Sequence, residues 1–324
     1  MGAVQWINIS EQNNKNGDKR MEMRFRAHET FSIRKGWLSK GMENIVAKPN
    51  LFVDKNENPM DVLGIGSNMV KALRFWLQAV GLTKEPKSGK RKQTLTHLGE
   101  LVYENDKYIE ETGTLYILQY QLACQKKEAT SWYFFFNEFT LSEFTRDDFV
   151  QELQKYILMS DENIKVAIRS LNDDFSCIVN TYLPSLKFNR DKVSPENNID
   201  CPFSELGLLD IVNKKKKLYK KSVPSPDSID PWIAYAVIMD RSENRKEINL
   251  NELLNKPCNI GKVFNLDAIT MLEILHEIEN IDLIKIIRTA GLDVIYINKP
   301  MDFYECVNQY YKNLDGDLWA GVGK

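Results

Sequence analysis

Cysteine and histidine are scarce in this sequence, which contains five cysteines and three histidines among 324 residues. The cysteines are odd in number and widely spaced, and no CxxC motif or Cys/His cluster occurs among them. These absences exclude a disulfide scaffold and a zinc site with ordinary ligand spacing. They predict a protein of the reducing cytoplasm. The five cysteines are Cys124, Cys177, Cys201, Cys258 and Cys306.

Long apolar runs are also absent. The longest apolar clusters, such as residues 132–136, fall far short of the roughly 18–20 residues that a membrane-spanning helix needs. The N-terminus shows no charged segment followed by an apolar one, so we expect no secretory signal and no membrane partner. A hydrophobic content of 43% nevertheless excludes a wholly disordered chain.

Common catalytic motifs are missing as well, since the sequence has no GxxxxGK[ST], GxSxG or HExxH pattern. A metal-dependent nuclease needs clustered carboxylates that hold Mg²⁺ and orient water. The nearest pattern pairs Asp227 with Glu243-Asn244-Arg245. Its last position is Arg245, where a nuclease site of this kind carries a lysine, and a predicted helix lies between Asp227 and Glu243. These two residues are weak catalytic candidates. No cofactor is evident, and Mg²⁺ is expected only if the protein is a nuclease.

Charge of neither sign prevails over the whole chain, whose formal net charge is −2. That total hides a gradient, because residues 1–100 hold 17 Lys and Arg against 10 Asp and Glu, a net +7, and the remainder carries −9. The densest basic stretch, residues 71–92, contains a single acidic residue, Glu85. Such a stretch favours an anionic partner. A second basic run, residues 214–221, is more typical of a solvated face.

The elements predicted around the first basic stretch follow the order of a winged helix-turn-helix. We expect an amphipathic helix over residues 68–80, capped by Ser67, then a hairpin over residues 82–96, and a new helix from His97. A short helix, a glycine-containing turn, a basic-faced helix and a basic-tipped hairpin characterise this motif. Because some winged helices serve protein contacts only, the pattern alone leaves a protein partner open.

Ten residues of this region are candidates for contacts with double-stranded DNA. Asn68, Lys71 and Arg74 would face the major groove, where such side chains hydrogen-bond to base edges. Arg34 and Lys40 would add contacts to the DNA backbone. Cations at the hairpin tip would hold phosphates. The hairpin set is Lys84, Lys87, Lys90, Arg91 and Lys92.

The predicted fold class is mainly α with small β-hairpins. The aromatic clusters of the middle region are more typical of core than of a base-stacking platform. Near the C-terminus, an acidic helix over residues 267–279 precedes a hairpin over residues 283–297, which favours a structural or protein-contact role. The predicted units are a flexible extension (1–20), a winged-helix DNA-binding domain (21–112), a helical middle domain (113–199) and a winged-helix-like α/β domain (200–324).

Several motifs follow one another in a consistent order over about residues 21–300. They are Phe31-x-x-Arg34-x-Gly36-Trp37-Leu38-x-Lys40-Gly41, Leu63-Gly64-x-Gly66-x-Asn68-Met69-Val70-Lys71-x-x-Arg74-x-Trp76, Leu95-Thr96-x-Leu98-Gly99, Gly113-Thr114-Leu115, Ala129-Thr130-x-Trp132, Phe136-Asn137-x-Phe139 and Cys201-Pro202-x-x-Glu205-Leu206-Gly207-Leu208. Together they resemble the SspB-type family of Ssp DNA phosphorothioation systems. That bacterial family of unknown-function proteins is encoded beside phosphoadenosine-phosphosulfate (PAPS)-reductase-like enzymes.

The resemblance implies a DNA-binding protein of a phage-defence system. The family is also associated with DNA nicking, which would open a strand for sulfur insertion. It also implies protein partners, namely a cysteine desulfurase, an ATPase-like protein and a PAPS-reductase-like protein. It supplies no catalytic residues in this sequence. Two alternatives remain open: a non-catalytic adaptor whose acidic C-terminal region docks those partners, and a winged-helix transcriptional regulator.

Overall fold

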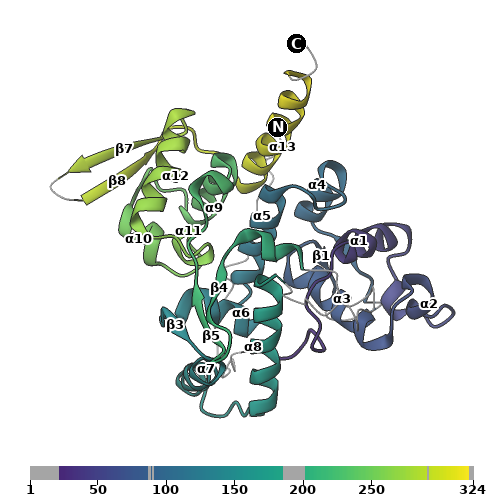
Figure 1. Cartoon of the computed structure of the whole chain (residues 1–324). Helices are drawn as coiled ribbons and strands as arrows, with labels where there is room; N and C mark the ends of the chain where they lie inside the picture. The colour runs from purple at the N-terminus through teal and green to yellow at the C-terminus, as the bar shows by residue number, and fades with distance from the viewer. Residues whose placement is uncertain (1–21, 87–88, 90, 185–200, 290–291, 321–324) are drawn as a thin grey trace, which may run out of the picture.

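The computed structural model describes residues 22–86, 89, 91–184, 201–289 and 292–320. Within this part of the chain the structure is mostly helical and carries three small antiparallel sheets of two or three strands (Figure 1). The predicted class, mainly α with small β-hairpins, is confirmed at that level. None of the described helices combines the length and the apolar character that crossing a bilayer requires.

The N-terminal part consists of short helices followed by a hairpin and a further helix. Gly64, in the left-handed region at φ 61°, ends the helix Pro59–Leu63. Gly81, at φ 76°, follows the helix Ser67–Ala79. Ser67 is not the N-cap that we predicted, because Gly66 holds that position and Ser67 is the first helical residue. The elements are α1 (Trp37–Ala47), η1 (Leu51–Val53), α2 (Pro59–Leu63), α3 (Ser67–Ala79), β1 (Thr83–Lys84), β2 (Thr94–Leu95) and α4 (His97–Asn105).

The predicted hairpin is confirmed, since β1 pairs with β2 in the register Thr83↔Leu95 and Lys84↔Thr94. The helix predicted from His97 is confirmed as well. Its N-cap is Thr96, whose side chain accepts a hydrogen bond from the Gly99 amide.

The middle region contains the aromatic core. Helix α5 is buried on every side, with ten of its twelve residues buried. Trp132, Phe135 and Phe136 are at most 1% exposed, so the aromatic cluster is core, as predicted. The elements are α5 (Thr112–Ala123), α6 (Thr130–Tyr133), the π-helical turn η2 (Phe134–Glu138), β3 (Glu143–Phe144), α7 (Arg146–Ser160) and α8 (Ile168–Tyr182).

A three-stranded sheet joins segments far apart in the sequence. Strands β4 (Leu209–Asn213) and β5 (Leu218–Lys221) form a hairpin whose turn is the second lysine run, and β3 pairs with β5 in the register Phe144↔Tyr219. This sheet therefore crosses residues 199 and 200, where the sequence predicts a domain boundary. The described core is likewise continuous from Ile33 to Tyr311.

The C-terminal part packs helices against the third sheet. The hairpin predicted over residues 283–297 is confirmed, and β6 adds a strand that the sequence analysis missed. The elements are η5 (Pro202–Leu206), η6 (Pro226–Ser228), α9 (Pro231–Arg241), β6 (Glu247–Asn249), α10 (Leu250–Asn255), α11 (Ile260–Val263), α12 (Ala268–Asn280), β7 (Ile284–Thr289), β8 (Leu292–Ile297) and α13 (Phe303–Ala320).

A buried polar cluster ties the start of the described chain to the middle region. Asp174 of α8 accepts hydrogen bonds from His28 Nε2 at 2.7 Å, Ser131 Oγ at 2.6 Å and the Arg26 amide at 2.8 Å. The His28 Nδ1 atom accepts a hydrogen bond from the Thr30 amide at 3.0 Å, so Nε2 carries the proton that is donated to Asp174. No residue near His28 in the sequence indicates this partner.

Candidate nucleic-acid interface

The first turns of α3 present two of the predicted groove-facing residues to solvent. Asn68 and Lys71 are both exposed and lie about one turn apart. The Lys71 Nζ atom lies 3.4 Å from Asn68 Oδ1 and 3.9 Å from Glu29 Oε1, and its side chain is 63% exposed. These loose contacts leave the ammonium group available to an anionic ligand.

Arg74, one turn further along α3, is held by the hairpin. Its Nε and Nη2 atoms donate to the two carboxylate oxygens of Glu85 at 2.9 and 2.6 Å, and Arg91 Nε donates to Glu85 Oε1 at 2.8 Å. The Glu85 side chain is only 4% exposed. Burial alone would raise its pKa, but the two guanidinium groups outweigh burial and hold the pKa of Glu85 below its usual range.

This Arg74–Glu85–Arg91 bridge fixes the hairpin against α3. Because Arg74 follows Lys71 by three residues on the same helix, the bridge places the hairpin beside the exposed face of α3. Two of the predicted DNA-contacting cations therefore share one carboxylate. The feature of the sequence that could have indicated this bridge is Glu85, the single acidic residue within the basic stretch of residues 71–92.

The remaining cations of the hairpin divide into two groups. Lys84, in β1, and Lys92, just before β2, are exposed, and neither side chain has an ion pair with any described residue. Lys87 and Lys90 lie outside the described residues.

Arg34 and Lys40 are both engaged within the protein. The Arg34 guanidinium lies 5.7 Å from the ring centre of Phe31 and 5.2 Å from that of Trp37. The Lys40 ammonium donates to the Leu63 carbonyl at the end of α2. Lys40 thus lies beside the chain that leads into α3, whereas Arg34 lies among aromatic rings.

The two weak catalytic candidates are not brought together. Asp227 lies in η6 before α9, and Glu243 follows the other end of α9. With a rise of about 1.5 Å per residue, the eleven residues of α9 hold its ends roughly 16 Å apart. In the described part of the chain, no three His, Cys, Asp or Glu side chains gather closely enough to hold a metal ion.

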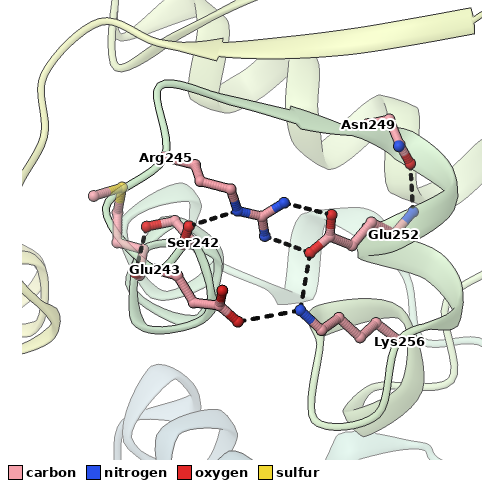
Figure 2. Close-up of polar contacts among 7 residues, drawn as sticks. Ser242, Glu243, Arg245, Asn249, Glu252 and Lys256 are labelled. Atoms are coloured by element: carbon pink, nitrogen blue, oxygen red, sulfur yellow. Dashed lines mark hydrogen bonds and ion pairs between the residues drawn. The ribbon is translucent and has the colours of Figure 1, made fainter. Parts of the chain in front are cut away.

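Glu243 belongs instead to an ion-pair network (Figure 2). Its Oε1 atom lies 3.2 Å from Lys256 Nζ, and Lys256 also contacts Glu252 at 3.3 Å. Arg245 donates hydrogen bonds to both carboxylate oxygens of Glu252, from Nη1 at 2.8 Å and from Nη2 at 2.5 Å. The hydrogen bonds from Arg245, helped by Lys256, lower the pKa of Glu252 to about 2. The acidic and basic groups here neutralise one another.

Comparisons with known proteins identify a family and two solved structures that are similar to this chain. A family described as "Protein of unknown function (DUF4007)" matches residues 25–311. A solved structure titled "Magnesium ion-bound SspB crystal structure" is similar with a TM-score of 0.78 and 26% identity, over 89% of this chain and 88% of that chain. A second, titled "SspB crystal structure", gives a TM-score of 0.77 and 25% identity over the same shares. No curated protein matches the chain.

The resemblance predicted from the sequence motifs is therefore confirmed at the level of family and fold. The match extends from the segment before α1 into α13, so it includes α3, the hairpin and the polar cluster around Asp174. The chain belongs to the DUF4007 family.

Proposed function

We propose that this protein is the DNA-binding component of a DNA phosphorothioation system of the Ssp type. The observation that carries the proposal is the structural likeness to SspB over 89% of the chain. The exposed residues of α3 and of the hairpin add a surface suited to a duplex. They are Asn68, Lys71, Lys84 and Lys92.

In this proposal α3 and the hairpin act as the reading helix and the wing of a winged helix-turn-helix. The exposed Asn68 side chain can make a bidentate contact to adenine, and Lys71 can reach guanine or a phosphate. Lys84 and Lys92 hold phosphates, which fix the position of the protein without reading sequence. Arg74 and Arg91 act as positioning residues, because Glu85 already occupies their guanidinium groups.

The combined substitution of Lys71, Lys84 and Lys92 by alanine is expected to weaken binding to a random-sequence duplex by about tenfold or more near 100 mM salt. Each lost phosphate contact also removes about 0.9 from the slope of log affinity against log salt concentration. The slope should therefore fall by two to three. Fluorescence anisotropy with a labelled duplex at several salt concentrations measures both quantities.

A matched control removes the same charge elsewhere. Lys165, Lys246 and Lys285 are exposed residues outside the N-terminal part, and their combined replacement by alanine should leave the slope unchanged. An equal loss in both triple variants would show that net charge, and not this surface, drives binding. If the unaltered chain binds no duplex yet copurifies with the cysteine desulfurase, ATPase-like or PAPS-reductase-like partner, the adaptor alternative replaces the proposal.

Magnesium-dependent nicking is the second candidate, because one similar structure is of magnesium-ion-bound SspB. Asp227 and Glu243 do not fit such a centre as a pair, since α9 separates them and Lys256 engages Glu243. We expect supercoiled plasmid to be nicked in Mg²⁺ but not in EDTA, at a rate that the combined Asp227→Ala and Glu243→Ala substitutions change less than about twofold. No nicking by the unaltered chain would remove this candidate, and a large loss in the variant would restore the pair.

A further inference from the structure

A cavity of about 360 Å³ lies away from the N-terminal surface, where the start of α7, one face of α8 and the β4–β5 turn meet. Its volume is within the range of small-molecule sites. Figure 1 shows α7, α8 and the hairpin of β4 and β5 close together at this end of the molecule. The second lysine run, which the sequence analysis treated as a solvated face, forms part of the wall.

One wall of the cavity is apolar and partly aromatic. Phe175 and Val179 come from successive turns of α8, and Tyr219 comes from β5. The Phe175 and Tyr219 rings contact each other edge to face, with centres 5.7 Å apart. Phe175 and Tyr219 are only 3% and 8% exposed, so each ring borders the cavity with a small part of its surface. Together with Val179 this part is apolar and can contact an aromatic ring of a ligand.

Three cations line the same cavity, namely Arg146, Lys216 and Lys217. The side chain of Arg146 is 54% exposed and meets one acid, Asp147, at 3.6 Å, while Asp147 itself is 89% exposed. Neither lysine ammonium has an ion pair with a described residue. Asp147 also lines the cavity, so its three cations exceed its one carboxylate by two charges.

The turn directs only part of the lysine run to the cavity. The Lys216 amide donates to Asn213 Oδ1 at 3.1 Å, and Lys217 adopts a left-handed backbone at φ 50°. A lysine with a left-handed backbone is less stable than a glycine in the same conformation, because its Cβ atom meets the neighbouring backbone. Lys214 and Lys215 belong to the same turn but do not line the cavity.

We propose that this cavity binds a nucleoside monophosphate, with the base against Phe175, Val179 and Tyr219 and the phosphate among Arg146, Lys216 and Lys217. The apolar wall alone would accept any flat ring, and the cations alone would accept any anion. Their combination selects a ligand that carries both parts. Asn180, exposed at the rim on α8, supplies the donor and acceptor that the edge of a base requires.

Two ligands carry both the base and the phosphate that the cavity would bind: a free mononucleotide and the terminal nucleotide of a DNA strand. Binding of the second ligand rests on the proposed DNA-binding function, whereas binding of the first does not. In either case the site is separate from the surface formed by α3 and the first hairpin.

Isothermal titration calorimetry of the full chain tests the proposal with three probes: deoxyadenosine 5′-monophosphate, deoxyadenosine and inorganic phosphate. The monophosphate is expected to bind at least tenfold more tightly than either fragment. Replacing both Lys216 and Lys217 by glutamate should weaken its binding at least tenfold. The matched control, Lys214→Glu with Lys215→Glu, changes the same charge in the same turn and should change binding less than threefold.

A second variant tests the site by shape. Asn180→Trp fills the mouth of the cavity from an exposed helix position and should abolish binding of the monophosphate while circular dichroism stays unchanged. Equal weakening in both lysine pairs, binding of phosphate as tight as that of the monophosphate, or full binding by Asn180→Trp would each overturn the proposal.

The two ligands are distinguished with a single-stranded oligonucleotide that carries or lacks a 5′-phosphate. Tighter binding of the phosphorylated strand than of the monophosphate assigns the site to strand ends, and the reverse assigns it to free nucleotides. The Lys71, Lys84 and Lys92 variant should retain monophosphate binding. Failure of the cavity and failure of the DNA-binding surface are thereby told apart.

Discussion

Replacing Asp174 by alanine is expected to destabilise the protein by about 3–5 kcal/mol, because three hydrogen bonds to a carboxylate are lost. The Asp174 and His28 side chains are 2% and 1% exposed, so removal of the carboxylate leaves buried donors without a partner. The buried donors are His28 Nε2 and Ser131 Oγ, and the partly buried Arg26 amide loses its acceptor as well. Because the donors come from two segments, residues 26–28 and α6, and the acceptor lies in α8, the loss also loosens the residues before α1 from α6 and α8. Urea denaturation followed by tryptophan fluorescence gives the free energy of unfolding.

The neighbouring residue Asp173 provides the control. Its carboxylate pairs with Arg26 at 2.7 Å, but the two side chains are 24% and 42% exposed. A partly solvated ion pair of this kind contributes only about 0–1 kcal/mol. Asp173→Ala should therefore cost at least about 2 kcal/mol less than Asp174→Ala, because it removes one solvated ion pair and leaves no buried donor without a partner. Similar costs for the two variants would show that the buried cluster does not stabilise the fold in the way described.

Gly99→Ala is expected to cost about 3 kcal/mol and to displace the first hairpin from α4. A Cβ atom at residue 99 would lie 2.0 Å from the backbone oxygen of Leu82. The contact joins a Cβ atom to a backbone oxygen, so no side-chain rotation can relieve it. The Leu82 carbonyl is also held in place, because it accepts a hydrogen bond from the Thr96 amide at 3.0 Å. Part of the backbone must move, and the segment entering β1 is the part in contact. Thermal unfolding reports the loss, and amide exchange of Thr83 and Leu95 reports the displacement.

Gly66→Ala is the matched substitution at a second glycine of the same region. Its backbone does not need the left-handed region, since φ is −66°, and a Cβ atom there meets nothing within 4 Å. We expect a change of less than about 1 kcal/mol, which reflects only the poorer N-cap. A loss at Gly99 no larger than that at Gly66 would contradict the close approach of α4 to Leu82.

The local elements of the fold were predictable because local chemistry specifies them. The start of α4 follows from the Thr96 cap, and the start of α7 follows from Thr145, which exchanges hydrogen bonds with Asp148 in a capping box. The first and last hairpins follow from pairs of strand-forming runs, each pair separated by a glycine-containing stretch. One local prediction was wrong: we expected Ser67 to cap α3, but Gly66 holds that position and Ser67 is the first helical residue.

The long-range arrangement was not predictable from one sequence. Nothing near Phe144 indicates that β3 pairs with β5, and nothing near His28 indicates Asp174. At the candidate surface, residue type alone could not distinguish Lys84, which is exposed, from Arg74, which is bound to Glu85. The domain boundaries and the DNA contacts stay predictions.

The Glu85 bridge has a consequence for how a wing would trade affinity against discrimination. By placing one negative charge between two arginines, the protein lowers the long-range attraction of the wing for any polyanion. In return the hairpin is held at one angle to α3. If the hairpin acts as a wing, one that carried only lysines would bind every DNA sequence more tightly, whereas a wing held by the Glu85 bridge would favour grooves that match its fixed position beside α3. In the proposed DNA-binding role, the lone acid of the basic stretch would thus lower the affinity for any duplex and raise the discrimination between duplexes.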